Sequence, residues 1–375
     1  MRKYIQSLDG IRGFGIIFVL LYHFLRLNGK DWSVMGFSWI WIQMFFVQSG
    51  FLITEILLES KSKPFGTYIG QFYWRRILRI FPVYFVYILA FVAIYVVFRK
   101  PGDFLQRLPY LLTFSYNYTR FITDLDFNSI WFIHFWSLAL EEQFYLVWPF
   151  LVYFLSRKNL QWLIAFALVA APVFRYWLTS YVLGAGYTAE MAGEITYAFT
   201  LSQFDAFAIG AAIPLFNLRE KITQPAKWMG ATLVMVLAAG AVNYIFIKRT
   251  HPDFSISSLG LSVAMIENLQ HVWSYSLINF LFLFVIILLI REDYKGIFNF
   301  KPLVNIGKVV YGMYIYHFVI LVAALALNNY LIHNFFIAFV IAFLSAYGAA
   351  YISYHYFEKR FLGLRDFWWS SHQKK

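Results

Sequence analysis

The sequence contains no cysteine and few charged residues. Of its 375 residues, only 13% are Asp, Glu, Lys or Arg, whereas a soluble domain carries about 25%. The absence of cysteine excludes disulfide bonds and thiol chemistry. In their place, 61% of the residues are hydrophobic and 22% are aromatic. This composition indicates that most of the chain lies in a lipid bilayer.

Long hydrophobic segments recur along the whole sequence. About 20 apolar residues span a bilayer as a helix, and the candidates are residues 10–28, 38–58, 80–98, 134–155, 160–182, 198–216, 228–247, 274–290, 304–327 and 331–357. The sequence therefore predicts an all-α, polytopic integral membrane protein with about ten transmembrane helices. We expect a single transmembrane domain over residues 1–375, without a cleavable signal peptide or an appended soluble domain. The polar stretch 101–130 is expected to form an external loop.

The distribution of Lys and Arg predicts the orientation of these helices. Basic residues favour cytoplasmic loops. With both termini in the cytoplasm, 21 basic residues fall on the inner side and 9 on the outer side, and Arg12 lies within the membrane. This bias accounts for the net charge of +12, so the charge does not indicate a nucleic-acid partner. No metal site is predicted, and the oligomeric state, including a homo-oligomer, stays open.

Two titratable residues lie on one face of the first hydrophobic segment. Arg12 and His23 are eleven residues apart, which in a helix is about 20° past three full turns and about 16 Å along the axis. Ionisable groups inside a bilayer are costly and mark functional sites. We expect Arg12 to hold an anion and His23 to act as a general base. Alternatively, Arg12 extends to the interface and His23 bonds a neighbouring helix.

A basic motif precedes the third hydrophobic segment, in the sequence Arg75-Arg76-Ile-Leu-Arg79-Ile-Phe-Pro82. Arg76 and Arg79 are three residues apart and share a helix face. Guanidinium groups bind phosphate in a bidentate manner, so this pair is a candidate substrate-binding element. The alternative is an anchor for lipid headgroups.

The fourth hydrophobic segment contains two adjacent carboxylates, Glu141 and Glu142, followed by Gln143 and Tyr145. Neighbouring residues in a helix point about 100° apart, so at most one carboxylate faces a given cavity. Such a group could orient a histidine, ligate a cation or be kept neutral by burial. The alternative is a buried hydrogen-bond network that locks helices together. Tyr145 is assigned to the substrate-binding set.

Three further features are weaker candidates. Ser49 precedes Gly50, a pair typical of close helix contact, although Ser49 is also a candidate substrate-binding residue. His317 lies near the middle of the ninth segment and is a candidate for the same set, while a buried packing role is the alternative. Asp205 and Arg175 are weaker intramembrane candidates of the same kind.

Taken in order, these motifs resemble those of the integral-membrane acyltransferase family 3, bacterial enzymes that O-acylate cell-surface glycans and related acceptors. The resemblance runs from Leu8-Asp9-Gly10 to His317. It includes Phe-Phe-x-x-Ser-Gly-Phe-Leu, Arg-Arg-x-x-Arg-Ile-x-Pro-x-Tyr and His-x-Trp-Ser-Leu-x-x-Glu-x-Gln-Phe-Tyr. Two positions depart from the pattern: Gln48 stands where the family usually has an aliphatic residue, and Val310 where a serine is common.

The resemblance implies an O-acyltransferase of the bacterial inner membrane, most often an O-acetyltransferase. Its co-substrate is acyl-coenzyme A, usually acetyl-CoA, and no cofactor is tightly bound. Arg76 and Arg79, together with Arg12, would hold the phosphates of coenzyme A. The acceptor would be a hydroxyl group of a glycan or a lipid-linked sugar.

The resemblance also implies a central role for His23, with two routes left open. The histidine either deprotonates the acceptor hydroxyl or accepts the acyl group and passes it on. Glu141 or Glu142 would orient or charge-stabilise it, as a carboxylate does in a catalytic triad. His317 would line the same cavity.

A transporter or flippase is the alternative function, because buried Arg, His and Glu also build substrate paths. Inverted repeats would favour a transporter, and the sequence shows no such symmetry. The identity of the acceptor and the length of the acyl chain stay open.

Overall fold

The structure, a computed structural model, describes residues 4–29, 36–98, 104–121, 129–252, 260–263, 266–291, 294 and 296–365. Within these ranges every regular element is helical. The α-helices are α1 (Gln6–Leu27), α2 (Ile40–Ser60), α3 (Phe65–Phe98), α4 (Phe104–Leu112), α5 (Phe135–Phe154), α6 (Arg157–Gly184), α7 (Ala189–Ala198), α8 (Phe204–Leu215), α9 (Leu218–Lys221), α10 (Pro225–Thr250), α11 (Gln270–Leu289), α12 (Lys301–Lys308), α13 (Val310–Leu327), α14 (Phe335–Ile352) and α15 (Lys359–Gly363). Short 3₁₀ turns cover Tyr116–Phe121, Thr200–Gln203, Glu267–Leu269 and Ile297–Asn299, and π-helical turns cover Asn328–Ile332 and Ser353–Glu358.

The described residues contain eight helices that are long and apolar enough to cross a membrane, and a ninth if α7 and α8 form one span bent by 70°. α5 is 20 residues long but lies outside this set, because its polar residues Glu141, Glu142 and Gln143 lower its hydropathy. The predicted all-α, multi-span architecture is confirmed. The count of ten spans and the orientation of the termini stay predictions, and residues 1–3 and 366–375 lie outside the described part.

Two predicted segment boundaries are wrong. The third segment was expected at 80–98, but α3 begins at Phe65 and runs for 34 residues without a break at Pro82. At 1.5 Å per residue it is about 51 Å long, so it must tilt or extend beyond a hydrocarbon core of about 30 Å. The ninth segment was expected to be continuous over 304–327. Instead Val309 separates α12 from α13.

The predicted external loop at 101–130 is partly helical. Residues 104–112 form α4, and a 3₁₀ turn covers Tyr116–Phe121. Residues 101–103 and 122–128 lie outside the described part.

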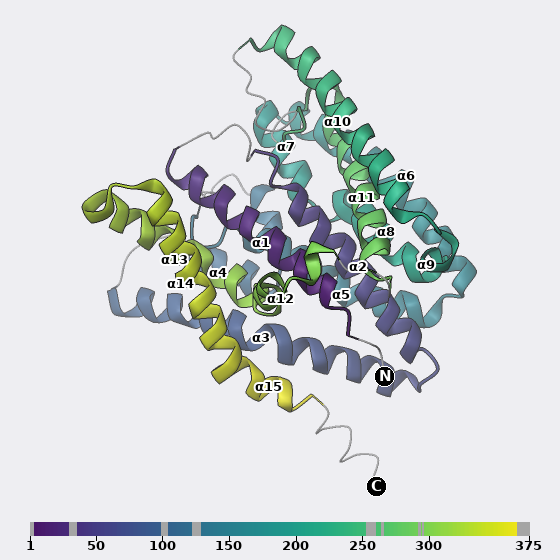
Figure 1. Ribbon diagram of the computed structural model, residues 1–375, viewed down its shortest axis with the longest axis horizontal. Coiled ribbons are helices and arrows are strands. Elements are labelled where there is room, and N and C mark those ends of the chain that lie inside the picture. The colour runs from purple at the N-terminus through teal and green to yellow at the C-terminus, as the bar shows by residue number, and fades with distance from the viewer. Residues whose placement is uncertain are drawn as a thin grey trace.

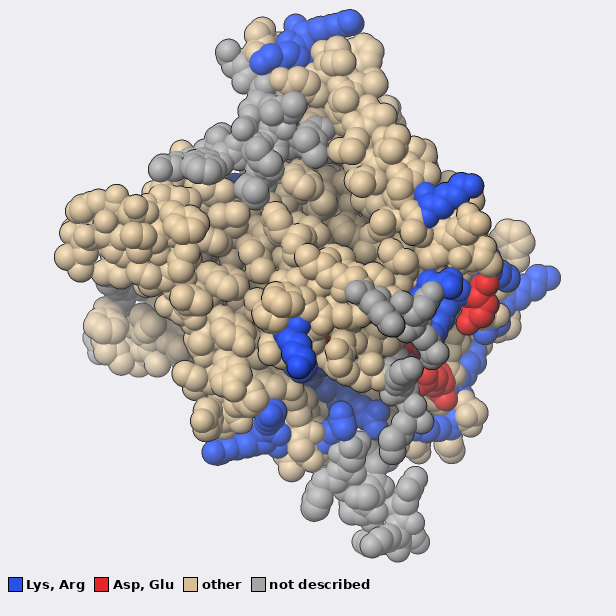
Figure 2. Space-filling model, in the orientation of Figure 1, with Lys and Arg blue, Asp and Glu red and all other residues tan. Residues whose placement is uncertain are grey.

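Figure 1 shows α1 at the centre of the molecule, packed against α12 and α13, while α3 runs along one edge towards α15. On the other side α2 packs on α8, and α10 lies along α11. Basic side chains gather towards the lower edge of Figure 2, where α15 and the first half of α3 lie. The helices that carry the predicted site residues are α1, α2, α3, α5 and α13.

The contact between α2 and α8 depends on two glycines. A Cβ atom on Gly50 would lie 2.1 Å from the backbone oxygen of Phe207, and one on Gly210 would lie 1.9 Å from that of Val47. Both distances are shorter than any real contact, so neither position accepts a side chain without moving a helix. The Ser49-Gly50 pair was predicted to permit close helix packing, and this is confirmed. Ser49, one residue before Gly50, donates a hydrogen bond to Glu141 of α5.

Candidate functional site

Four cavities follow one another along α1. The mouth cavity (about 490 Å³) and the guanidinium cavity (about 190 Å³) share Arg12 and Arg79. The guanidinium cavity and a bridging cavity (about 70 Å³) share Arg12 and Glu141. The bridging cavity and the histidine cavity (about 90 Å³) share Ile42 and Tyr314. Because neighbouring cavities have walls in common, they form one row from Arg12 to His23.

α1 sets the two ends of this row. It is an unbroken α-helix from Gln6 to Leu27, so the predicted spacing of about 16 Å between Arg12 and His23 applies. Arg12 lines the first three cavities, and His23 lines the fourth. Both side chains are half-buried. The helix thus connects an end that carries a guanidinium group to an end that carries a histidine.

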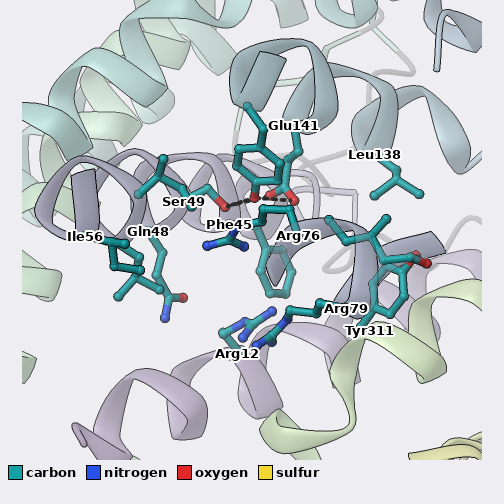
Figure 3. A pocket seen from close by; sticks show the side chains of 14 residues that line it. Arg12, Phe45, Gln48, Ser49, Ile56, Arg76, Arg79, Leu138, Glu141 and Tyr311 are labelled. Atoms are coloured by element: carbon teal, nitrogen blue, oxygen red, sulfur yellow. Dashed lines mark hydrogen bonds between the residues drawn. The ribbon is translucent and has the colours of Figure 1, made fainter. Parts of the chain in front are cut away.

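The guanidinium cavity brings together residues from five helices, α1, α2, α3, α5 and α13, several of which Figure 3 shows. Arg12 comes from α1, and Arg76 and Arg79 from α3; Ser49 comes from α2, and Glu141 from α5. Three guanidinium groups face one carboxylate, so the lining carries an excess of positive charge. The prediction that Arg76 and Arg79 share a face is confirmed. Their exposed neighbour Arg75 is not part of the described lining.

Glu141 is held in place by two hydroxyl groups. Ser49 Oγ donates a hydrogen bond to Glu141 Oε1 over 2.9 Å, and Tyr145 Oη donates one to Oε2 over 3.2 Å. The guanidinium carbon of Arg76 lies 5.0 Å from the centre of the Tyr145 ring, within the range of a cation–π interaction. Tyr145 therefore contacts both the carboxylate and one of the cations around the cavity.

The predicted pairing of a glutamate with His23 is not what the structure shows. Among the described residues, the hydrogen bonds of Glu141 come from Ser49 and Tyr145, and this carboxylate lines the guanidinium and bridging cavities rather than the histidine cavity. Glu142 lines none of these four described cavities. The reason is the position of Glu141 in the fold. It lies beside Arg12, which is about three helical turns along α1 from His23.

His23 lies beside His317 instead. Its ring centre lies 5.3 Å from that of His317, which in turn lies 4.8 Å from that of His134. His317 is fully buried, and its Nδ1 donates a hydrogen bond to the backbone oxygen of Tyr314 over 2.6 Å. A carbonyl oxygen only accepts, so this bond fixes the proton on Nδ1. His317 therefore supports the wall behind His23, and its predicted substrate-binding role stays a prediction.

His134, rather than His317, lines the histidine cavity with His23. His134 was not among the site residues predicted from the sequence, although it begins the motif that contains Trp136 and Glu141. The sequence feature that could have identified it is the position of His134 at the start of a polar and aromatic run. Its relation to His23 depends on how α5 and α1 pack, which the linear pattern does not reveal.

The two positions that depart from the family pattern both lie in this row. Gln48 is buried, lines the mouth and guanidinium cavities, and donates a hydrogen bond from Nε2 to the backbone oxygen of Leu8 over 3.0 Å. It thus ties α2 to the first turns of α1. Val310 lines the bridging cavity. In the part of the chain that the structure describes, no three His, Asp or Glu side chains are arranged to hold a metal ion.

Asp205 and Arg175 form a separate buried cluster between α6, α8 and α11. Their side chains are 0% exposed, and Arg175 Nη1 lies 3.1 Å from Asp205 Oδ2. Arg175 also donates hydrogen bonds to the backbone oxygens of Ser202 and Val272 over 2.7 and 2.8 Å. Neither residue belongs to the row of cavities along α1. The cluster joins helices, which is a structural role.

Comparison with known proteins agrees with the motifs. The family described as the acyltransferase domain matches residues 5–355. Over 343 residues the chain is 32% identical to the peptidoglycan O-acetyltransferase OatA of Listeria monocytogenes, covering 85% of this chain and 50% of that protein. Over 386 residues it is 28% identical to the putative peptidoglycan O-acetyltransferase YrhL of Bacillus subtilis, covering 97% of this chain and 56% of that protein. Over 342 residues it is 25% identical to the O-acetyltransferase OatA of Staphylococcus aureus, covering 85% and 51%.

The chain therefore spans about half the length of the curated relatives it matches. No solved structure matches it with statistical significance. The family match extends from the turn before α1 to the π-helical turn after α14 and so includes the whole row of cavities. With its motifs in the family's order, the chain belongs to the acyltransferase-domain family, the integral-membrane acyltransferase family 3.

Proposed function

We propose that this protein is a membrane O-acetyltransferase that moves an acetyl group from acetyl-coenzyme A to a hydroxyl group of a cell-surface glycan. The observation that carries the proposal is the row of cavities along α1, which leads from three guanidinium groups to His23. Relatives named as peptidoglycan O-acetyltransferases support a glycan acceptor. The bias of basic residues supports a cytoplasmic position for the N-terminal end of α1.

The donor would enter through the mouth cavity. Coenzyme A carries phosphate groups, and Arg12, Arg76 and Arg79 offer charge-assisted hydrogen bonds to them. Its extended arm would follow the bridging cavity past Tyr314 and bring the thioester towards His23. The narrow bridging cavity favours a thin, flexible chain over a bulky group.

The transfer step would take place at the histidine cavity. A ring nitrogen of His23 accepts the proton of the acceptor hydroxyl, and the hydroxyl oxygen attacks the thioester carbonyl. The carbon–sulfur bond breaks as the new carbon–oxygen ester bond forms. The coenzyme A thiolate then takes the proton from the imidazolium, which regenerates neutral His23. No oxidant, metal or further co-reactant is required.

Glu141 has a different proposed role from the one that the motif suggested. Because Ser49 and Tyr145 hold it beside the arginines, it balances part of their charge and keeps the guanidinium groups in position when the cavity is empty. This lowers the cost of keeping three cations together in a partly dry site. Its effect on turnover would therefore pass through donor binding.

The test is the release of free coenzyme A by purified protein supplied with acetyl-CoA and glycan. We expect His23→Ala to lower turnover by about 10²–10⁴-fold, the usual contribution of a general base. His251→Ala is the matched control, because His251 is exposed and lies outside the described cavities. Wild-type turnover in His23→Ala would overturn the mechanism, and transport of a glycan without coenzyme A release would favour a transporter.

A further inference from the structure

A groove outside the row of cavities lies between α5, α6 and α8 and has a volume of about 510 Å³. We call it the α5–α6 groove. None of the described residues that line it also lines the row along α1. On α5, Glu141 and Tyr145 line the guanidinium cavity, whereas Leu146 and Val147 line the groove, so the two spaces lie on different sides of this helix. The proposed function makes no use of the groove.

The long walls of the groove are apolar and open outwards. Leu146, Val147 and Phe204 line it and are 62%, 52% and 40% exposed. Ala167 lines it from α6, which is one of the candidate membrane spans. Deeper in the groove, Trp148 is only 7% exposed. Because apolar walls favour hydrocarbon over water, a lipid chain is the occupant that they fit.

One end of the groove is polar, where the two 3₁₀ turns after α4 and α7 meet Gln143 of α5. Gln143 Nε2 donates hydrogen bonds to the backbone oxygen of Phe114 over 2.8 Å and to Asn117 Oδ1 over 3.0 Å. Thr200 Oγ1 donates one to Gln143 Oε1 over 2.6 Å, so Tyr118 Oη is the donor in its 2.9 Å contact with Thr200 Oγ1. The protons of these groups are thus all used within the protein.

Two further hydroxyl groups complete the polar end. Thr113 Oγ1 donates a hydrogen bond to the backbone oxygen of Pro109 over 2.7 Å, so Ser115 Oγ is the donor in its 2.7 Å contact with Thr113 Oγ1. A hydroxyl oxygen can also accept two hydrogen bonds, and within the described part of the chain Ser115 Oγ accepts none. The polar end therefore offers lone pairs rather than protons to a ligand.

This pattern selects the head of the ligand. No Asp, Glu, Lys, Arg or His is among the described residues that line the groove, and phosphate oxygens need donors or cations. A phospholipid head therefore finds no partner at this end. A hydroxyl group, by contrast, can donate its proton to the oxygen of Ser115. The complementary ligand is a lipid that has acyl chains and a hydroxyl group but no phosphate.

We propose that the α5–α6 groove is a binding site for diacylglycerol, an uncharged lipid with two acyl chains and one free hydroxyl group. One acyl chain lies along Leu146, Val147 and Trp148, and the hydroxyl group donates a hydrogen bond to Ser115 Oγ. The site goes beyond the proposed function and does not depend on it, because it lies outside the cavities that lead to His23.

The first experiment uses the position of Trp148. The protein is reconstituted in phosphatidylcholine vesicles that contain diacylglycerol, and one of the two lipids carries bromine atoms, which quench tryptophan fluorescence on contact. Because Trp148 is only 7% exposed, chains on the outer surface reach it poorly. Its signal is the difference between the wild type and Trp148→Phe. We expect brominated diacylglycerol to quench this signal several-fold more strongly than the same mole fraction of brominated phosphatidylcholine.

A matched pair of variants tests the groove itself. Ala167→Phe places a ring inside the groove, whereas Ala165→Phe places the same ring at an exposed position of the same helix. We expect Ala167→Phe to remove the extra quenching by diacylglycerol and Ala165→Phe to keep it. An equal loss in both variants would overturn the site, because it would indicate a general disturbance of α6.

The hydroxyl contact is tested by titration with brominated diacylglycerol. Ser115→Ala removes the free oxygen, and we expect the apparent affinity for diacylglycerol to fall about threefold, the effect of one neutral hydrogen bond. Ser180→Ala is the matched control, since Ser180 is exposed on α6 and lies outside the groove. An unchanged affinity in Ser115→Ala would overturn diacylglycerol as the ligand.

Two other results would overturn the proposal. Equal quenching of Trp148 by both brominated lipids, including none by either, would show that the groove does not select diacylglycerol. Stronger quenching by a brominated polyisoprenoid alcohol would assign the groove to a different lipid. None of these measurements requires turnover, so their failure leaves the proposed function in place, and a wild type that releases no coenzyme A leaves the groove in place.

Discussion

Arg175 and Asp205 lie between α6, α8 and α11, whereas Arg12, Arg76 and Arg79 line the guanidinium cavity between α1, α3 and α5. The first cluster is buried and balanced in charge: one cation and one anion form an ion pair, the cation also donates hydrogen bonds to two backbone oxygens, and both side chains are 0% exposed. The second cluster has three cations, one carboxylate and an open volume of about 190 Å³.

This difference separates a structural role from a binding role for intramembrane charge. A buried ion pair whose charges offset each other leaves no net charge for an ionic ligand, so its effect is to hold helices in register. A group of cations with too few anions is costly unless water or an anionic ligand completes it. The guanidinium cavity is therefore where a ligand would lower the free energy most. The following predictions test this distinction.

The largest effect is expected from breaking the ion pair between Arg175 and Asp205. Asp205→Asn leaves the Arg175 charge buried without its counter-ion, which typically costs about 3–5 kcal/mol. We expect a large drop in the thermal unfolding temperature of the detergent-purified protein. Replacing both residues with apolar side chains, Arg175→Met with Asp205→Leu, should recover much of it, because no unpaired charge remains. If Asp205→Asn unfolds at the wild-type temperature, the cluster does not hold the helices together.

A different effect, on ligand affinity rather than on stability, is expected from the arginines of the guanidinium cavity. Arg76→Gln combined with Arg79→Gln removes two charge-assisted contacts, each worth about 1.5–3 kcal/mol to a bound anion. We expect affinity for coenzyme A, measured by calorimetry, to fall at least a hundredfold while the unfolding temperature stays near that of the wild type. Arg75→Gln is the matched control, since Arg75 is exposed on the same helix. A fall in stability equal to that of Asp205→Asn would remove the distinction between the two clusters.

The smallest effect is expected at the hydroxyl that holds Glu141. Ser49→Ala removes one of the two hydrogen bonds to that carboxylate, and hydrogen bonds between membrane helices are worth about 0.6 kcal/mol on average. We expect about a threefold loss in affinity for acetyl-CoA, measured in the same way. A loss of a hundredfold or more would mean that Ser49 touches the substrate directly rather than positioning Glu141.

Much of the site could be predicted from the sequence because helical geometry is local. The face shared by Arg12 and His23, and that shared by Arg76 and Arg79, follow from 3.6 residues per turn. The close packing at Gly50 also follows from residue type, since only a small side chain allows two helices to touch. For the same reason, the prediction that only one of Glu141 and Glu142 faces the cavity agrees with the lining.

Other features could not be predicted from the linear pattern. The partner of Glu141 was expected to be His23 but is the pair Ser49 and Tyr145. The relation depends on how far α5 is shifted along α1, a quantity that no single helix encodes. His134 was not predicted as a site residue for the same reason. The first half of α3 was not predicted as part of a membrane helix because Arg75, Arg76 and Arg79 interrupt its hydrophobicity.

By itself, the sequence determined that the chain is helical and embedded in lipid, that it carries the motifs of its family, and which side chains lie on the same face of each helix. Only the tertiary structure decided which faces meet. It separated the buried ion pair of Arg175 and Asp205 from the guanidinium cavity at Arg12. It also placed Arg26 and Glu194 beside His23. The physical reason is that helix periodicity is set by bonds between near neighbours, whereas the meeting of helices depends on packing between residues far apart in the chain.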